Sequence, residues 1–357
     1  MTTVVAPTGE PTAGSTHSSG WIRAARRAES VRARRVSVVL AVVGVVAFCV
    51  SLSVGDFPIP LADVVPALVG LGTDDAEFIV GTLRLPRALA AVLVGAAFGV
   101  SGAIFQALAR NPLASPDIIG ITAGASTAAV ALIVLASAPA VVVSLGSFAG
   151  ALATATAIYL LAWRQGVSAY RLVLVGIGLG AMLASVTSYL LTRAEIFDAA
   201  RATVWLTGSL NGRGWDQIRP VAVALAVLVP AALVLARQLR VLQLGDDTAA
   251  GLGVPVERIR AALVVVGVGL AAVATAAAGP IAFVAFVSAP IARRLVRSPL
   301  TIVPAALTGA VLVLVADLVA RRLFAPTELP VGIVTGIIGA PYLLWLIARA
   351  NRIGRGG

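Results

Sequence analysis

The side chains that most often carry chemistry in proteins are scarce in this sequence. Cys49 is the only cysteine and His17 the only histidine, which excludes an intrachain disulfide, a cysteine-based zinc site and histidine acid–base or metal chemistry. All 27 basic residues are arginine, whereas a Walker A phosphate-binding loop requires a lysine. We therefore expect this chain to be no enzyme and to bind no cofactor or metal, so that any ATP hydrolysis takes place on a partner.

Ionisable residues inside the long apolar runs would indicate proton or ion coupling. Asp317 is the exception to their near absence, and Arg321 follows it by four residues on the same helical face. This spacing predicts a local ion pair near the outer end of that run. The scarcity argues against a proton- or sodium-coupled carrier and fits a pathway that moves a large solute without binding it tightly.

Three arginines, Arg84, Arg87 and Arg321, lie close to acidic loops at one predicted side of the membrane. Long basic side chains at such positions can anchor helices at the interface by extending towards the headgroups. They can equally form a basic docking point for carboxylates of an external partner. The residues alone leave both interpretations open.

The composition defines the elements that must position these residues. Hydrophobic residues make up 59% of the chain and charged residues 12%, with a mean hydropathy of +1.00, whereas soluble domains are about a quarter charged. This predicts an all-α, polytopic membrane protein. The net charge of +11 does not indicate nucleic-acid binding, because the arginines cluster beside apolar runs as topology signals do.

Ten membrane spans are expected, separated by charged, proline- or glycine-containing segments. They are 36–55, 88–109, 118–137, 140–163, 172–192, 218–236, two spans within 261–292 divided at Gly279-Pro280, 300–320 and 331–348. The domain organisation that follows is a disordered basic tail over 1–35, a ten-helix transmembrane domain over 36–350 and a tail over 351–357. With the N-terminus cytoplasmic, 19 arginines fall on the cytoplasmic side and eight outside, as the positive-inside rule requires. Both termini are then cytoplasmic.

The longest polar interval in the second half of the chain is 242–260. Asp246, Asp247 and Thr248 suit a first helical turn, while Gly253 and Pro255 end a helix. The interval therefore predicts a short amphipathic helix on the arginine-rich side of the membrane. Such a helix is a contact surface for a soluble partner.

Small residues recur four positions apart in several spans, among them Gly176 and Gly180, and Gly332 and Gly336. Glycine at this spacing lets helix backbones approach closely in lipid. Packing within one subunit is one interpretation, and a subunit seam or a wide pathway is the other.

Four long motifs occur together in order. They are the run from Arg84-Leu-Pro-Arg87 to Gly120, the run Leu244-Gly-Asp-Asp-Thr-Ala-Ala-Gly-Leu-Gly-Val254, the run from Gly279-Pro280 to Arg293, and the run from Glu328-Leu-Pro to Pro341. In this respect the chain resembles the permeases of iron-siderophore and vitamin B12 ABC importers (FecCD/BtuC-like) over roughly residues 36–350. Many of those permeases have Pro-His-Ile-Ala-Arg where this chain has Ala289-Pro-Ile-Ala-Arg293. That variant resembles the second permease of ferric catecholate (enterobactin-type) systems.

The resemblance implies a type II ABC importer permease fold and a role in ATP-driven import of ferric siderophores across the bacterial cell membrane. It implies a second permease subunit, with a heterodimer favoured over a homodimer, two cytoplasmic ATPase subunits that bind ATP and Mg, and an extracytoplasmic siderophore-binding protein. Import of cobalamin or haem is the alternative within the family, and an ATP-independent secondary carrier is the alternative of another class.

The resemblance also assigns roles to residues. The implied ATPase-coupling residues are Leu244, Gly245, Asp246, Ala249, Gly251, Leu252 and Gly253, which carry one residue more than the family pattern. Arg84, Arg87 and Arg321 correspond to the arginines that dock the binding protein. The pathway or subunit seam is assigned to Gly176, Gly180, Gly332 and Gly336.

Overall fold

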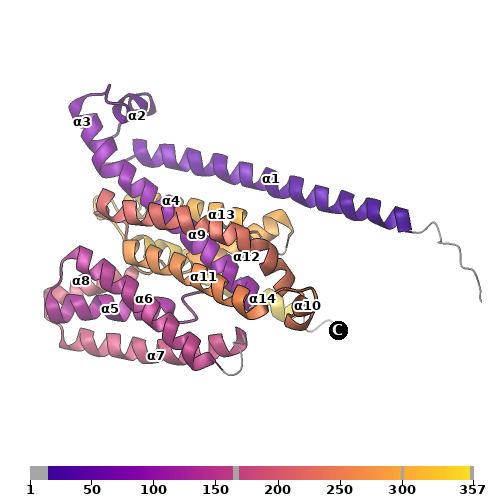
Figure 1. Ribbon diagram of the computed structural model, residues 1–357. Coiled ribbons are helices and arrows are strands. Elements are labelled where there is room, and N and C mark those ends of the chain that lie inside the picture. Colours follow the sequence, from indigo (N-terminus) through magenta and orange to yellow (C-terminus); the bar gives the residue numbers. More distant parts are fainter. Residues whose placement is uncertain (1–14, 164–168, 299–300, 354–357) are drawn as a thin grey trace, which may run out of the picture.

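The computed structural model describes residues 15–163, 169–298 and 301–353, and the regular structure of these ranges is helical throughout (Figure 1). The elements are α1 (Ser15–Ser53), α2 (Leu61–Leu68), α3 (Asp74–Glu77), the π-helix η1 (Phe78–Arg84), α4 (Leu85–Leu108), α5 (Ile121–Ala136), α6 (Ala140–Ala162), α7 (Ala169–Arg193), α8 (Ile196–Thr207), α9 (Trp215–Leu242), α10 (Asp246–Gly251), α11 (Val256–Ala278), α12 (Val284–Val296), α13 (Ile302–Arg322) and α14 (Val331–Ile353). The parts 1–14 and 354–357 of the predicted tails lie outside the described residues.

Each of the ten predicted spans corresponds to a helix: α1, α4, α5, α6, α7, α9, α11, α12, α13 and α14. Within the described residues, seven helices are long and apolar enough to cross a membrane, and α5 and residues 331–346 of α14 form shorter apolar helices. The all-helical, polytopic class predicted from composition is confirmed. The chain turns at Ser137, where α5 ends, and at Gly279, both with positive φ, close to the two predicted breaks.

Two helices are longer than the sequence predicted. A disordered tail was expected over residues 15–35, but they belong to α1. The helix continues through them because Ala, Arg and Glu favour helix formation and no glycine or proline interrupts residues 21–43. The second span starts at Asp74 rather than Ala88, since α3, η1 and α4 form one continuous helix of 35 residues. At 1.5 Å per residue its length is about 52 Å, beyond the ~30 Å of a bilayer core.

The bundle is built around α4, of which nearly every residue from Ala88 to Ala107 is buried or half-buried. It packs on α13, α11, α12 and α9, and its glycines allow this. A Cβ at Gly95 would overlap the backbone of Gly309 in α13, and one at Gly102 would overlap Ala285 in α12. The small-residue spacing on this helix therefore serves packing inside the chain.

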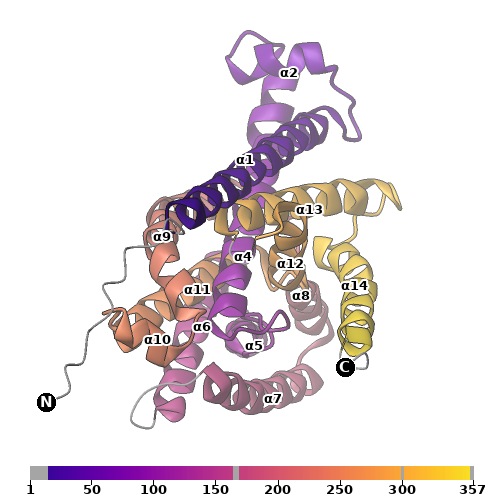
Figure 2. The same cartoon turned by 90° about the vertical axis from the view of Figure 1, so that its right-hand side faces the viewer.

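The periphery of the bundle is formed by α1, α7, α9 and α14 (Figure 2). Only 11% of the apolar window of α1 and 17% of that of α7 are buried within the chain. Both helices consequently present apolar surface to lipid or to another subunit.

The bundle has two ends of different character (Figure 1). One end carries α2 and α3, which stand beyond the helices, and α8. The other end carries α10, the N-terminal part of α1 and the C-terminal end of α14. The predicted coupling residues and the predicted docking residues divide between these two ends.

Candidate functional site

The segment 242–260 forms a compact helical corner. Helix α9 ends at Leu242, α10 occupies only Asp246–Gly251, and α11 begins at Val256. Gly245 and Gly253 have φ values of 116° and 79°, which glycine adopts without strain. These two glycines reverse the chain before and after α10. The short helix predicted from Asp246 and Gly253 is therefore present, although no side chain caps its N-terminus.

Asp246 ties α10 to the rest of the bundle. Its Oδ1 accepts a hydrogen bond from Arg110 Nη2 at 2.8 Å, and its Oδ2 accepts one from Arg260 Nη2 at 2.7 Å. Arg110 belongs to the loop after α4, and Arg260, which is 7% exposed, belongs to α11. Arg260 also donates to Glu257 at 2.8 Å. One carboxylate thus links α10 to the loop after α4 and to α11.

The remaining predicted coupling residues divide into one anchor and an outer surface. Ala249 is fully buried and packs into the main core. Leu244 and Leu252 are 65% and 64% exposed beside the acidic residues of α10, and Gly251 and Gly253 are exposed as well. Two exposed leucines on a charged corner outside the apolar spans form a surface suited to a partner protein.

At the opposite end, Asp317 gathers two of the three predicted docking arginines. This aspartate is 1% exposed. Arg87 Nη2 lies 3.1 Å from the aspartate Oδ1, and Arg321 Nε lies 3.1 Å from its Oδ2. The Arg321 contact is an ion pair whose geometry does not meet that of a hydrogen bond. Arg87 also pairs with Glu328 at 2.8 Å. The predicted Asp317–Arg321 pair is present, but the sequence did not indicate that Arg87, more than two hundred residues away, shares the same carboxylate.

Arg84 has a different environment from the other two arginines. Its guanidinium donates to the carbonyls of Leu52 at 2.7 Å and Ser53 at 2.9 Å, and to Phe57. It therefore caps the last turn of α1 and is only 7% exposed. Gly55 leaves the space that this guanidinium fills, because a Cβ there would overlap it.

The four predicted pathway glycines do not share one environment. Gly176 packs against the backbone of Ile119, Gly180 lies next to Gly120, and Gly332 donates its N–H to Gly208 O at 3.1 Å. A Cβ at Gly336 would meet nothing within 4 Å. Gly176, Gly180 and Gly332 thus have packing partners inside the chain, and Gly336 faces open space.

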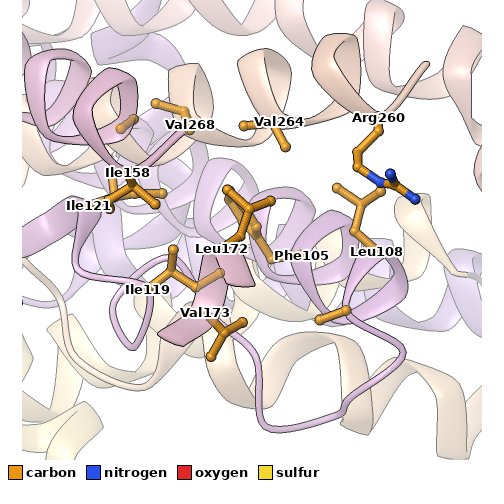
Figure 3. A pocket seen from close by; sticks show the side chains of 12 residues that line it. Phe105, Leu108, Ile119, Ile121, Ile158, Leu172, Val173, Arg260, Val264 and Val268 are labelled. Carbon is orange, nitrogen blue, oxygen red and sulfur yellow. The ribbon is translucent and has the colours of Figure 1, made fainter. Parts of the chain in front are cut away.

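A small internal void lies between α4, α6, α7 and α11 (Figure 3). It is lined by apolar side chains such as Phe105, Ile158, Leu172 and Val264, with Arg260 at its margin. Its volume is about 30 Å³, enough for a single water. This void is a packing gap and cannot hold a solute of chelate size.

A larger cavity of about 510 Å³ opens at the end that carries α8. Ser209, Asn211, Arg201 and Arg213 contribute its polar lining, together with Glu328. Burial lowers the pKa of Arg213 from its usual value. The sequence analysis did not single out these residues, although the glycine-rich run 208–214 marks the irregular chain that lines the cavity.

The fold and the relatives of the chain together define the class of protein. The chain is a polytopic helical bundle with a charged helical corner at one end, and its relatives define it as the transmembrane permease subunit of an ABC importer, whose ATPase is a separate chain. The comparisons with known proteins agree with this class. The model of the FecCD transport family matches residues 41–349, and the chain belongs to that family.

Individual relatives support the same assignment. The chain is 44% identical to the ferric enterobactin transport system permease protein FepG of Escherichia coli, over 86% of this chain and 94% of that protein. It is also 44% identical to the achromobactin transport system permease protein CbrC of Dickeya dadantii, over 88% and 91% of the two chains. An inward-facing structure of a metal-chelate type ABC transporter superposes with a TM-score of 0.79 and 26% identity, covering 88% of this chain and 99% of the other.

Proposed function

We propose that this chain is one of two permease subunits of a bacterial ATP-driven importer of ferric siderophores, and that the second permease is a different chain. Relatives named for enterobactin, achromobactin and hydroxamate siderophores support this substrate class. A cobalamin permease of Halobacterium salinarum is also similar, at 38% identity. Cobalamin is therefore the alternative substrate of this chain.

The observation that carries the mechanism is the bridge made by Asp246. In our proposal the end of the bundle with α10 is cytoplasmic, as are both termini, and the exposed Leu244 and Leu252 seat in the ATPase. Motion of the ATPase then acts on α10 and passes through Asp246 to Arg110 and Arg260. Of the four glycines, Gly336 is the best candidate to line the pathway between the two permeases, because it faces open space.

At the outer end we propose that the binding protein docks over the cluster of Arg87, Arg321 and Glu328. Carboxylates of the binding protein would exchange with Glu328 as partners of Arg87, because Glu328 is the more exposed of its two carboxylates at 31%. Arg84 contributes by holding the end of α1 beside this surface rather than by direct contact, since its guanidinium is occupied by backbone carbonyls.

The test measures uptake of radioiron-labelled ferric catecholate in cells that lack other iron importers, with transport-coupled ATP hydrolysis measured on the reconstituted complex. Asp246→Asn removes the charge of the bridge, whereas Asp247→Asn removes a neighbouring exposed charge that has no ion-pair partner among the described residues. We expect D246N to lower uptake and coupled hydrolysis at least about fivefold, since hydrogen bonds to charged groups contribute ~1.5–3 kcal/mol, and D247N to resemble the unaltered protein.

Three results would contradict the proposal. Equal activity of D246N and D247N would remove the coupling role of the bridge. Loss of cobalamin uptake, with iron uptake intact, in cells lacking this chain would exclude the siderophore assignment. Uptake that continues after the ATPase is disabled would favour the ATP-independent carrier.

A further inference from the structure

A groove of about 790 Å³ opens on the end of the bundle that carries α10, away from the bridge made by Asp246. Its walls are the N-terminal part of α1, the last turns of α9 and the start of α13. None of the sites described above uses this groove.

The α9 wall of the groove carries two cations. Arg237 and Arg240 are three residues apart on one helical face, both line the groove and both are exposed. Neither makes an ion pair or side-chain hydrogen bond within the described residues. Glu29 on the α1 wall instead accepts a hydrogen bond from Ser298. Two arginines that converge on one space favour an oxyanion, since guanidinium groups bind phosphate through parallel N–H donors.

The α13 wall supplies further donors. Thr301 is the N-cap residue of α13, but its side chain makes no capping hydrogen bond. The threonine is 5% exposed, and its buried hydroxyl has no hydrogen-bond partner among the residues that the structure describes. The first amides of a helix also lack intrahelical acceptors and favour anions. Thr301 and the N-terminus of a helix of 21 residues thus lie at the same groove as the two arginines.

Another part of the lining is apolar. Leu233, one turn before Arg237, is 43% exposed, and Val303 on the first turn of α13 is 45% exposed. Both line the groove. An occupant must therefore present an anionic group to the arginines and hydrocarbon to the leucine and valine. A phospholipid has this arrangement, and basic grooves between helices at the membrane interface bind anionic headgroups.

We propose that this groove is a binding site for an anionic phospholipid, whose phosphate is held by Arg237, Arg240 and Thr301 while its acyl chains lie along Leu233 and Val303. The occupied site joins α1 to α9 and α13. Since α1 has little buried surface of its own, the lipid adds a contact that stabilises the position of α1 at this end of the bundle.

Native mass spectrometry of the full-length chain, purified in detergent and supplied with defined lipids, tests the proposal. Phosphatidylglycerol and phosphatidylcholine with identical acyl chains are compared, and inorganic phosphate is added as a soluble competitor. The charge variant is Arg237→Gln with Arg240→Gln. The matched control is Arg193→Gln with Arg219→Gln, which removes two exposed arginines from the other end of the bundle.

The unaltered chain should retain one phosphatidylglycerol. Retention should be at least about tenfold weaker in the charge variant, because two charge-assisted contacts to the phosphate are lost. The control should retain the lipid as the unaltered chain does. Thr301→Val, which preserves the shape of the side chain, should weaken retention about fivefold. Equal retention of both lipids, or equal loss in the charge variant and its control, would overturn the site. Displacement of the lipid by millimolar phosphate would show a soluble-anion site instead. A melting temperature within about 2 °C of that of the unaltered chain is required of each variant, and T301V tests the groove if the charge variant does not fold.

Discussion

Asp317→Asn should be among the most destabilising single changes at the outer end of the bundle. The substitution keeps the size of the side chain but removes the negative charge that faces Arg87 and Arg321. Asp317 has 2% side-chain exposure and its two partners have 11% and 10%, so water does not replace the lost carboxylate. Arg87 keeps its ion pair with Glu328, whereas the one hydrogen bond that remains to Arg321 within the described residues is to the hydroxyl of Ser51.

The magnitude follows from this difference in burial. Removing one partner of a buried ion pair costs about 3–5 kcal/mol, because a buried charge remains without compensation. Asp56 provides the matched control: it pairs with Arg322 at 3.4 Å but has 74% side-chain exposure. Exposed pairs contribute about 0–1 kcal/mol, so Asp56→Asn should leave stability nearly unchanged.

The free energy of unfolding can be measured for each variant by SDS titration in mixed micelles, with the fluorescence of the five tryptophans as the signal. Arg321→Gln in the D317N background should recover ~0.5–3 kcal/mol relative to the sum of the single changes, because the uncompensated cation is then absent. A loss of less than about 1 kcal/mol in D317N, equal to that in D56N, would refute the account of Asp317 as the buried counterion.

Three further predictions concern other parts of the chain. Gly95→Ala should lower the melting temperature, because its Cβ overlaps the backbone of α13, while Gly81→Ala, with nothing within 4 Å, should not. Burial raises the pKa of Asp117, in the loop before α5, to about 6. Its protonation thus stabilises the folded chain below pH ~4, the unfolded value, and this contribution is lost as the pH rises through about 6. The melting temperature of D117N should therefore match that of the unaltered chain at pH 4 and exceed it increasingly towards pH 7, and a constant difference would contradict the pKa. Gly336→Phe should reduce uptake without altering the melting temperature, whereas Gly332→Ala should lower the melting temperature; uptake unaffected by G336F would remove Gly336 from the pathway.

Much of the fold could be predicted from the sequence because the membrane restricts it. Backbone groups in lipid must be paired within helices, so apolar runs of span length correspond to helices, and Gly279-Pro280 marks a break. The helical structure of residues 15–35 and 74–87 was harder to predict, since their charged side chains suit either a loop or a helix that extends beyond the bilayer. Both segments are helical in the structure, because their residues favour the helix and they are continuous with the apolar parts of α1 and α4.

The candidate site was predictable only where partners are close in sequence. Asp317 and Arg321 are one turn apart, and α10 is marked by Asp246 and Gly253. The pairing of Arg87 with Asp317 joins α4 to α13, and no spacing in a single sequence indicates such a contact. The glycines show the same limit: Gly332 and Gly336 share a motif, but only the neighbouring helices decide that one is packed and the other open.

The cap that Arg84 places on the end of α1 joins two segments of the chain that are synthesised one after the other. Residues 27–53 are the most hydropathic candidate span and have the least buried window, so this segment can enter the bilayer as soon as it leaves the ribosome. Its last carbonyls have no guanidinium partner until Arg84 has been synthesised and α4 has inserted. The C-terminal end of α1 is therefore completed by a side chain that is synthesised after the helix itself.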